Sequence, residues 1–179
     1  MIKLFKKFLE DYEYHSLHFG IYGNLAKKIT DFGKSIPDEL INSAAGGREK
    51  YPHITCKYGL VDSISRKLVD LLIGTGSVKV TFGPITRFEN ENCDVLKIDI
   101  ISADIRRLNK LIVSNMKCVD TFTEYHPHLT IAYMNRGSVQ PYLLNESRVD
   151  NKKFLGKQLI FDTITFASKD RLEHTISLN

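Results

Sequence analysis

The sequence carries the same short pattern at two places. The stretch YPHITCKY, which contains His53 and Thr55, recurs as HPHLTIAY with His128 and Thr130, keeping Pro, His, Thr and Tyr at the same four offsets. In an extended strand, residues two apart point to the same face. Each stretch would therefore project an imidazole and a hydroxyl side by side. The sequence predicts two strands that each carry one half of an active site.

Hydrophobic periodicity predicts further strands and helices around these two stretches. We predict strands at about 14–22, 52–59, 77–83, 93–101, 128–134, 157–168 and 172–178. Helices are predicted from Asn24 through Phe32, from Asp62 or Ser63 through Leu72, and from Ser102 or Asp104 through Ile112. Residues 34–50 have no sustained period and are predicted to form a long loop. Several strand pairs have connections too short for parallel crossovers, so a mixed or antiparallel sheet is expected.

Composition is that of one ordinary globular domain, which we expect to span residues 1–179. The chain has 42% hydrophobic and 26% charged residues, and 25 Lys and Arg against 21 Asp and Glu, without Arg-rich blocks. This mild excess suits a small anionic ligand better than a long polyanion. Cys56, Cys93 and Cys118 lack metal-finger spacing, which favours a reducing compartment and no structural zinc. Apolar runs are too short for a membrane span, so we expect a cytoplasmic protein.

Two histidines that face one another across a cleft can cleave a phosphodiester by acid–base chemistry. One neutral imidazole takes a proton from the attacking hydroxyl or water, and the other, protonated, gives one to the leaving oxygen. Both forms of histidine are accessible near neutrality. Thr55 and Thr130 would then donate hydrogen bonds to the non-bridging phosphate oxygens. The alternatives are half-buried structural histidines beside strand-favouring threonines, and a metal site, for which no third ligand recurs beside either stretch.

The sequences PHIT at residues 52–55 and PHLT at residues 127–130 resemble the paired His-x-Thr signatures of the 2H phosphoesterase superfamily. The resemblance implies an α+β fold that is bilobal and pseudo-symmetric, with mixed or antiparallel sheets around a central groove and helices outside. It also implies activity on cyclic or 2′,5′-linked nucleotide phosphates, with no metal or other cofactor. The site residues that it implies are His53 and His128 as the acid–base pair and Thr55 and Thr130 as phosphate ligands.

Within that superfamily, the chain is similar in outline to phage anti-CBASS cyclic-oligonucleotide phosphodiesterases. This similarity implies that a ribose 2′-hydroxyl of a cyclic di- or trinucleotide attacks the 3′,5′ linkage of the same ring. It also implies that the protein acts in the host cytoplasm. The expected partner is thus a small nucleotide, with no stable nucleic-acid partner and no membrane. An alternative enzyme would act on 2′,3′-cyclic phosphates or 2′,5′-linked oligonucleotides, including RNA ligase-like chemistry. A non-enzymatic alternative is a nucleotide-binding sponge or an RNA-binding module.

Substrate-binding candidates lie outside the repeated pattern. Tyr12, Tyr14 and Tyr22 are candidates for stacking on bases, and Tyr12 is the best placed of them because it lies just before the first predicted strand. Packing in the core or at a rim is the alternative role. Glu146, in the polar segment 135–153, is a candidate acceptor of hydrogen bonds from a base amino group. Its alternative is an exposed position in a surface loop.

The remaining residues of interest are expected to pack or to be exposed. In a regular strand, Tyr58 and Tyr133 lie five residues after each histidine and so point to the opposite face, as packing residues. Alternation likewise places Cys56 and Ile131 on the packed face. The other histidines have no repeated catalytic counterpart and are expected to be structural or exposed: His15, His18, His126 and His174.

Overall fold

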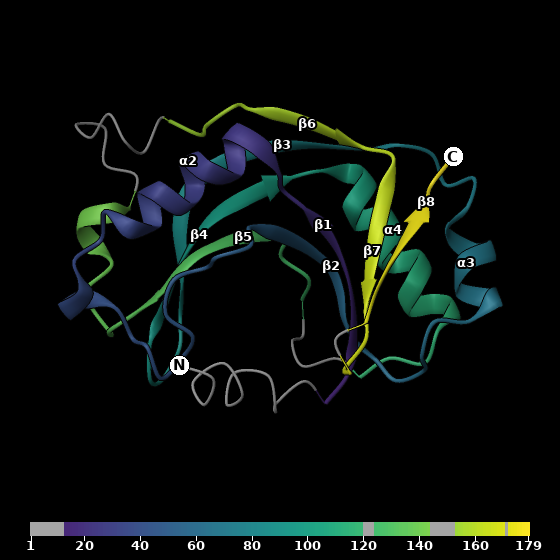
Figure 1. Ribbon diagram of the computed structural model, residues 1–179, viewed down its shortest axis with the longest axis horizontal. Helices are drawn as coiled ribbons and strands as arrows, with labels where there is room; N and C mark the ends of the chain where they lie inside the picture. Colours follow the sequence, from purple (N-terminus) through teal and green to yellow (C-terminus); the bar gives the residue numbers. More distant parts are fainter. Residues whose placement is uncertain (1–12, 120–123, 144–152, 171) are drawn as a thin grey trace.

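The computed structural model describes residues 13–119, 124–143, 153–170 and 172–179. Its centre is one antiparallel sheet of eight strands in the order β6-β3-β4-β5-β2-β1-β7-β8 (Figure 1). The strands are β1 (His15–Gly20), β2 (His53–Leu60), β3 (Val78–Glu89), β4 (Asp94–Ile101), β5 (His128–Met134), β6 (Gln158–Phe161), β7 (Thr163–Ala167) and β8 (Glu173–Ser177). The helices are α2 (Gly23–Lys34), α3 (Arg66–Leu72) and α4 (Ala103–Asn115), with 3-10 turns η1 (Asp38–Leu40) and η2 (Gln140–Tyr142).

The sheet is strongly curled because two consecutive strands lie toward its opposite ends. β6 pairs with β3, whereas β7 pairs with β1, and Asp162 alone separates the two strands along the chain. One residue spans only about 3.5 Å, so the two ends of the sheet must approach one another. The rings of Phe19 and Phe161, with centroids 5.0 Å apart, pack across this closure. The single strand predicted for residues 157–168 is therefore wrong, since the chain turns at Asp162.

The helices pack on the outer side of the curled sheet (Figure 1). α2 contacts β5, and α4 contacts β2 and β3. The buried face of α4 follows the predicted helical spacing, with Ile105, Leu108 and Ile112 at most 2% exposed. The prediction that the sheet is mixed or antiparallel and that helices lie outside it is confirmed in its antiparallel form. The bilobal, pseudo-symmetric division stays a prediction.

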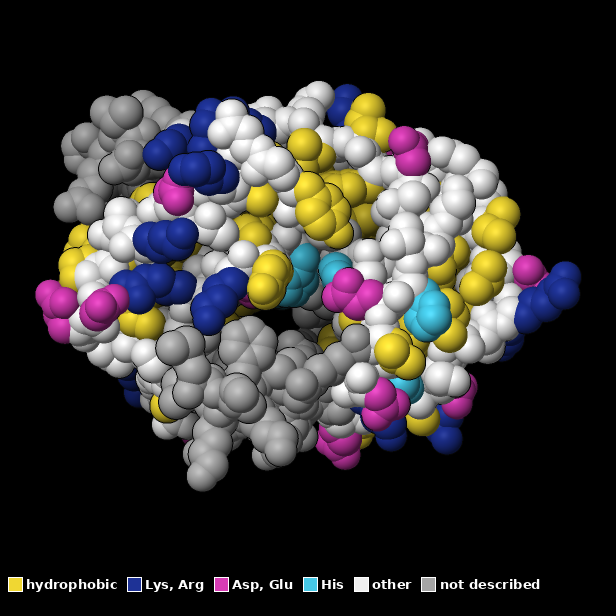
Figure 2. Space-filling model, in the orientation of Figure 1, with side chains coloured by type: hydrophobic (Ala, Val, Ile, Leu, Met, Phe, Trp, Pro, Cys, Tyr) yellow, Lys and Arg dark blue, Asp and Glu magenta, His cyan; other side chains and the backbone are white. Residues whose placement is uncertain are grey.

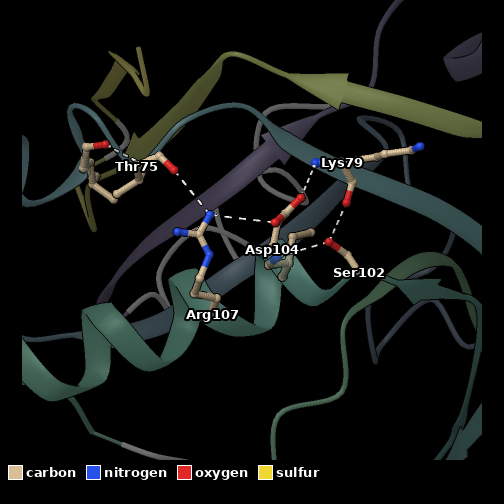
Figure 3. Close-up of polar contacts among 7 residues, drawn as sticks. Thr75, Lys79, Ser102, Asp104 and Arg107 are labelled. Carbon is tan, nitrogen blue, oxygen red and sulfur yellow. Dashed lines mark hydrogen bonds and ion pairs between the residues drawn. The ribbon is translucent and has the colours of Figure 1, made fainter.

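A polar cluster fixes the start of α4 against β3 (Figure 3). The Ser102 hydroxyl accepts the Ile105 N–H at 3.1 Å and donates to the Lys79 carbonyl at 2.6 Å. A carboxylate oxygen of Asp104 accepts the Lys79 N–H at 3.0 Å. Arg107 lies 3.7 Å from Asp104 and donates to a carbonyl in the turn before β3. The helix therefore begins at the predicted place, and its hydrogen bonds to the backbone of Lys79 in β3 hold it there.

Two predicted helix starts are wrong. α2 begins at Gly23 after Tyr22, so Asn24 is not its cap, and Tyr22 makes no side-chain capping bond. α3 begins at Arg66, later than Asp62 or Ser63, because the Ser65 hydroxyl accepts the Leu68 N–H at 3.3 Å. β3 also runs beyond the predicted end at residue 83, and a register shift against β4 lets it continue.

The long loop predicted between α2 and β2 supports the neighbouring motif strand. β2 and β5 share the bridge Ile54–Leu129 and then diverge. The loop bridges the diverging part of β5, pairing Ile41 with Met134 and Arg48 with Ala132. Among the described residues, no helix is long and apolar enough to cross a membrane.

Candidate active site

The two motif strands are neighbours in the sheet. Ile54 of β2 faces Leu129 of β5 in an antiparallel pair. This register sets His53 across from Thr130, and Thr55 across from His128. Ile54 and Leu129 are fully buried beneath the helices, whereas the histidines and threonines are half-buried on the other face. The structure thus brings the four predicted residues together on the inner face of the curled sheet.

The two imidazoles are held in the same way. Nδ1 of His53 donates to the Tyr51 carbonyl at 2.9 Å, and Nδ1 of His128 donates to the His126 carbonyl at 2.8 Å. A carbonyl oxygen only accepts hydrogen bonds, so the proton of each neutral ring sits on Nδ1. The lone pair of each Nε2 is then available for a ligand. A carboxylate oxygen of Glu49 also lies 4.0 Å from Nδ1 of His53.

The repeated proline explains how this hydrogen bond forms locally. Pro52 and Pro127 each lie between the histidine and the residue whose carbonyl accepts its Nδ1–H. Proline restricts the residue before it to extended conformations and fixes its own φ. The proline carbonyls are also bound, by the N–H of Ile21 at 2.8 Å and of Ile100 at 3.0 Å. The chain entering each strand is therefore held rigid just before the histidine.

Each motif strand also contains a bulge directly after its threonine. In the β1–β2 pair, Thr55 faces His18 and Lys57 faces Leu17, so Cys56 is the extra residue. Cys56 is fully buried, as predicted. Burial raises the pKa of its thiol well above the usual range, so the thiol stays protonated.

The second motif strand repeats this bulge at the same position. In the β4–β5 pair, Thr130 faces Lys97 and Ala132 faces Leu96, so Ile131 is the extra residue. Ile131 is 1% exposed, which confirms its predicted place on the packed face. The burial patterns of the two motif strands are consequently the same along their shared length.

The bulges overturn the predicted orientation of the two motif tyrosines. Inserting one residue reverses the alternation, so Tyr58 and Tyr133 are half-buried on the same face as the histidines. The ring of Tyr58 contacts that of Tyr14 edge-on, with centroids 6.1 Å apart. Sequence alternation alone could not predict the orientation of these rings, because no residue in the motif indicates that a bulge is present.

A third histidine belongs to the same face. His18 faces Thr55 across the β1–β2 pair, and its ring contacts that of His53 with centroids 5.2 Å apart. Burial, together with the charge of a protonated His53, lowers the pKa of His18 to about 4. His18 is therefore neutral at physiological pH. His18 was expected from the sequence to be structural or exposed, because its place beside His53 depends on strand register.

Lys97 occupies the corresponding place beside the second motif. It faces Thr130, and its side chain is 6% exposed. Its ammonium donates to Thr86 Oγ1 at 2.6 Å, pairs with Asp99, and lies 4.2 Å from the centroid of the Phe88 ring. This buried cation therefore lies one strand away from the second histidine and threonine.

The surroundings of His128 disfavour its charged form. The Phe88 ring meets the His128 ring edge-on, with centroids 4.8 Å apart. Burial is the main cause that lowers the pKa of His128, and the positive charges of Lys97 and of a protonated His53 act in the same direction. The Nδ1 bond to the His126 carbonyl and the nearby Asp99 act in the opposite direction.

Figure 2 shows a hollow near the centre of one face, with histidine side chains in its wall. Lysine and arginine side chains gather on the side toward α2. Neither Thr55 nor Thr130 has its hydroxyl bonded to another described residue. The described residues contain no group of three or more His, Cys, Asp or Glu that could hold a metal ion. The predicted substrate ligands Tyr12 and Glu146 lie outside the described residues.

Comparison with known families assigns the class of this fold and site. A model described as the 2′-5′ RNA ligase superfamily matches residues 32–173, more than half of the chain. The chain therefore belongs to the 2′-5′ RNA ligase superfamily, and its resemblance to the 2H phosphoesterases is confirmed. Members of the 2H phosphoesterase superfamily are phosphodiesterases or ligases. No curated protein sequence matches the chain.

Solved structures support the same fold. The protein TT0787 of Thermus thermophilus is similar to the chain with a TM-score of 0.63 and 10% identity, covering 92% of this chain and 97% of that one. Kluyveromyces marxianus Usb1 has a TM-score of 0.54 and 11% identity, over 92% of this chain and 98% of that one. Usb1 with uridine monophosphate has a TM-score of 0.53 and 12% identity, over 93% and 99%. At these identities, the likeness shows the fold.

Proposed function

We propose that the chain is a metal-independent phosphodiesterase that acts on a small nucleotide. In this proposal His53 and His128 are the acid–base pair, and Thr55 and Thr130 bind the phosphate as parts of two half-sites related by an approximate two-fold axis. The supporting observation is the duplicated hydrogen bond from each Nδ1 to a backbone carbonyl, which leaves each Nε2 for the substrate. The matched strand registers and bulges support the two-fold relation.

The two histidines have unequal surroundings, which gives the proton transfer a direction. We assign the acceptor role to His128, because burial and the Lys97 ammonium disfavour its protonation. His53 is then the donor. Its other ring neighbour, His18, is neutral and does not compete for this role.

The reaction follows from these roles. Nε2 of His128 accepts the proton of the ribose 2′-hydroxyl as that oxygen bonds to the neighbouring phosphorus. The bond from phosphorus to the 5′-oxygen breaks, and this oxygen takes the proton from Nε2 of His53. The product carries a 2′,3′-cyclic phosphate at one end and a 5′-hydroxyl at the other. The Thr55 and Thr130 hydroxyls donate to the non-bridging oxygens as negative charge develops there.

A nucleotide substrate is supported by the superfamily and by the uridine monophosphate bound to Usb1. Our finer proposal is a cyclic di- or trinucleotide, the substrate class of phage anti-CBASS enzymes. The second candidate is a 2′,3′-cyclic phosphate or a 2′,5′-linked oligonucleotide, which the name of the superfamily favours. A 2′,5′ linkage leaves the 3′-hydroxyl as the attacking group, and a 2′,3′-cyclic phosphate must be attacked by water. These substrates therefore share the acid and base roles of the two histidines with a cyclic oligonucleotide, but not the attacking group.

The test is turnover of defined substrates by the purified protein in EDTA. Cyclic dinucleotides, cyclic trinucleotides, 2′,5′-oligoadenylate and 2′,3′-cyclic nucleotides are incubated separately, and the products are resolved by chromatography. We expect one class to be cleaved without metal. Tight binding without turnover of any of them would instead support a nucleotide sponge.

Variants of the two histidines test the assigned roles. His53→Ala and His128→Ala should each lower kcat by about 10²–10⁴-fold, the usual contribution of one positioned acid or base. His174→Ala is the matched control, because His174 is exposed on β8, away from the motif strands. Full activity in either motif variant, with the fold retained by circular dichroism, would remove that histidine from the mechanism.

A further inference from the structure

Two exposed tyrosines flank the strand pair that carries His53. Tyr22 is 78% exposed and Tyr51 is 76% exposed, the highest values among the large hydrophobic side chains of the described residues. Gly20 faces His53 in the β1–β2 pair, and Tyr22 follows Gly20 by two residues. Tyr51 precedes His53 by two residues and supplies the carbonyl that holds its imidazole. Both tyrosines are therefore tied by the backbone to the His53 end of the site.

The Tyr22 ring lies over the backbone of Gly20. A β-carbon at position 20 would be 2.4 Å from the Tyr22 hydroxyl oxygen and 2.9 Å from its Cε2 atom. Residues of β1 alternate between a buried and a half-buried face, and Phe19 is on the buried face with 1% exposure. Position 20, next to Phe19, therefore belongs to the other, inner face of β1. The phenol ring thus lies on the same side of the sheet as His53. The missing side chain at Gly20 provides the room.

The corresponding positions at the His128 end hold no tyrosine. Asp99 faces His128, as Gly20 faces His53. Ile101 follows Asp99 by two residues and is 63% exposed. His126 supplies the carbonyl that holds the imidazole there. The His53 end of the site therefore has two exposed tyrosine rings. The His128 end has the side chains of Ile101, His126 and Asp99 instead.

We propose that Tyr22 and Tyr51 form a nucleobase-stacking subsite at the His53 end of the site. Exposed aromatic rings bind nucleobases through their π-faces and tolerate any base. Tyrosine is suited to this position because it has few rotatable bonds and a polar end that reaches water. The inference rests on the proposed function and deepens it. With His53 as the proton donor, the stacked base belongs to the nucleoside that carries the leaving 5′-oxygen.

The subsite is tested first by binding, which needs no turnover. The chain contains no tryptophan, so Tyr22→Trp introduces a single tryptophan into the subsite, whose fluorescence can be excited separately from that of the tyrosines. Adenosine monophosphate and uridine monophosphate should quench this fluorescence, whereas ribose 5-phosphate, which lacks a base, should not. Ile160→Trp, at an exposed position of β6 that adjoins neither motif strand, is the control and should not respond. Equal quenching by ribose 5-phosphate, equal quenching in the control, or no quenching in Tyr22→Trp by millimolar nucleotide would overturn the proposal.

Kinetics with the cleaved substrate provide the second test. Tyr22→Ala should raise KM about tenfold with little change in kcat, because one stacked base is lost while the reacting groups stay in place. Tyr22→Phe keeps the ring and should behave like the unmodified protein, and Ile160→Ala, outside the site, should change neither constant. An unchanged KM in Tyr22→Ala would contradict the stacking role. If no substrate is cleaved at all, the proposed function fails, but the fluorescence experiment still decides whether the subsite binds bases.

Discussion

Lys97 is the residue that distinguishes the two halves of the site most clearly. Its place beside Thr130 corresponds to that of His18 beside Thr55, where the side chain is neutral. Lys97 itself is buried and paired with Asp99. A buried cation of this kind persists only with such partners, and its field is poorly screened by solvent. It therefore lowers the pKa of the neighbouring His128, and the Asp99 carboxylate offsets part of this effect.

Lys97→Met should make His128 easier to protonate. The ammonium disfavours the imidazolium form, so its removal raises the pKa of His128 toward the ordinary value. Because the proposed base must be neutral, the acidic limb of the kcat/KM profile should then move to higher pH. NMR titration of the His128 ring measures the same shift without turnover. Lys110→Met, at an exposed position on α4, is the control and should leave both measurements unchanged.

A downward shift or no shift in Lys97→Met would show that the charge of Lys97 does not set the proton affinity of His128. Asp99 then remains as a charged neighbour whose removal can be tested in the same way, with the opposite sign. The double variant Lys97→Met with Asp99→Asn also removes the unpaired carboxylate that the single variant leaves behind.

The repeated motif identifies four candidate site residues from the sequence but not their neighbours. His53, Thr55, His128 and Thr130 were accessible because their pattern lies within single strands and occurs twice. His18 and Lys97 reach the site only through pairing with strands distant in sequence. Their selection requires the register, and the register depends on the bulges that the motif does not reveal.

At the scale of elements, α4 supports the first motif strand at its bulge. The Asn109 side chain, 9% exposed, donates to the Cys56 carbonyl at 2.7 Å. The Tyr125 hydroxyl donates to the Thr55 carbonyl at 2.7 Å. Where a bulge interrupts the ladder, these side chains satisfy backbone groups that the neighbouring strand leaves unpaired. The bulge that orients Thr55 therefore depends on a helix residue and on the segment before the second motif.

Asn109→Ala should lower both stability and activity. It leaves the Cys56 carbonyl without its partner in a buried place, which costs about 1–3 kcal/mol. It also frees the bulge beside Thr55, so kcat should fall as well. Asn115→Ala is the matched control, because Asn115 makes a similar side-chain bond at an exposed position of the same helix. Chemical denaturation and steady-state kinetics provide the measurements, and equal effects of the two substitutions would exclude a special role for Asn109.

Helices and strands were predicted best where periodicity was regular. The range predicted for the second motif strand is that of β5, and Ser102 caps α4 as expected. The strand predicted at 157–168 failed because the turn at Asp162 is a single residue without Gly or Pro. The chain turns at Asp162 because the two ends of the curled sheet meet there. The residues around Asp162 include no turn-forming residue type that would predict this.

At the scale of the whole molecule, Asp162 connects both ends of the sheet. Its carboxylate accepts hydrogen bonds from the Ser77 hydroxyl and from the Asn179 side chain, the latter at 3.2 Å. Its carbonyl accepts the Leu178 N–H at 2.8 Å. The corner thereby joins β6, β7 and the end of the chain. We therefore expect the described part of the chain to unfold as one cooperative unit.

The same corner should give the protein an acid-sensitive component of stability. Hydrogen bonds from Ser77 and Asn179 lower the pKa of Asp162 in the folded state. Its contribution is thus present above the unfolded pKa, near 3.9, and is lost as pH falls through the lower folded value. Asp162→Asn should lower the melting temperature at pH 7, and the difference from the unmodified protein should shrink toward pH 3.

Asp70→Asn is the control for this measurement, because Asp70 is at an exposed position of α3 and pairs with exposed Arg66 at 3.5 Å. Its effect should be small at both pH values. A difference between Asp162→Asn and the unmodified protein that stays constant from pH 7 to pH 3 would show that the Asp162 charge does not contribute to closing the sheet.

The hydrogen bond from each imidazole to the carbonyl two residues before it lies within a single tripeptide, which we call a cassette. The tripeptides Tyr51-Pro52-His53 and His126-Pro127-His128 each supply the carbonyl that accepts the hydrogen bond from their own histidine ring. Sequence on either side can then diverge without disturbing the geometry of the ring. A designer could treat the two cassettes as interchangeable parts, transplanting Tyr51 to the other end or His126 to this one. In such grafts, stacking of a base on Tyr51 would move with the tripeptide, whereas the proton affinity of each histidine would stay with the surrounding residues.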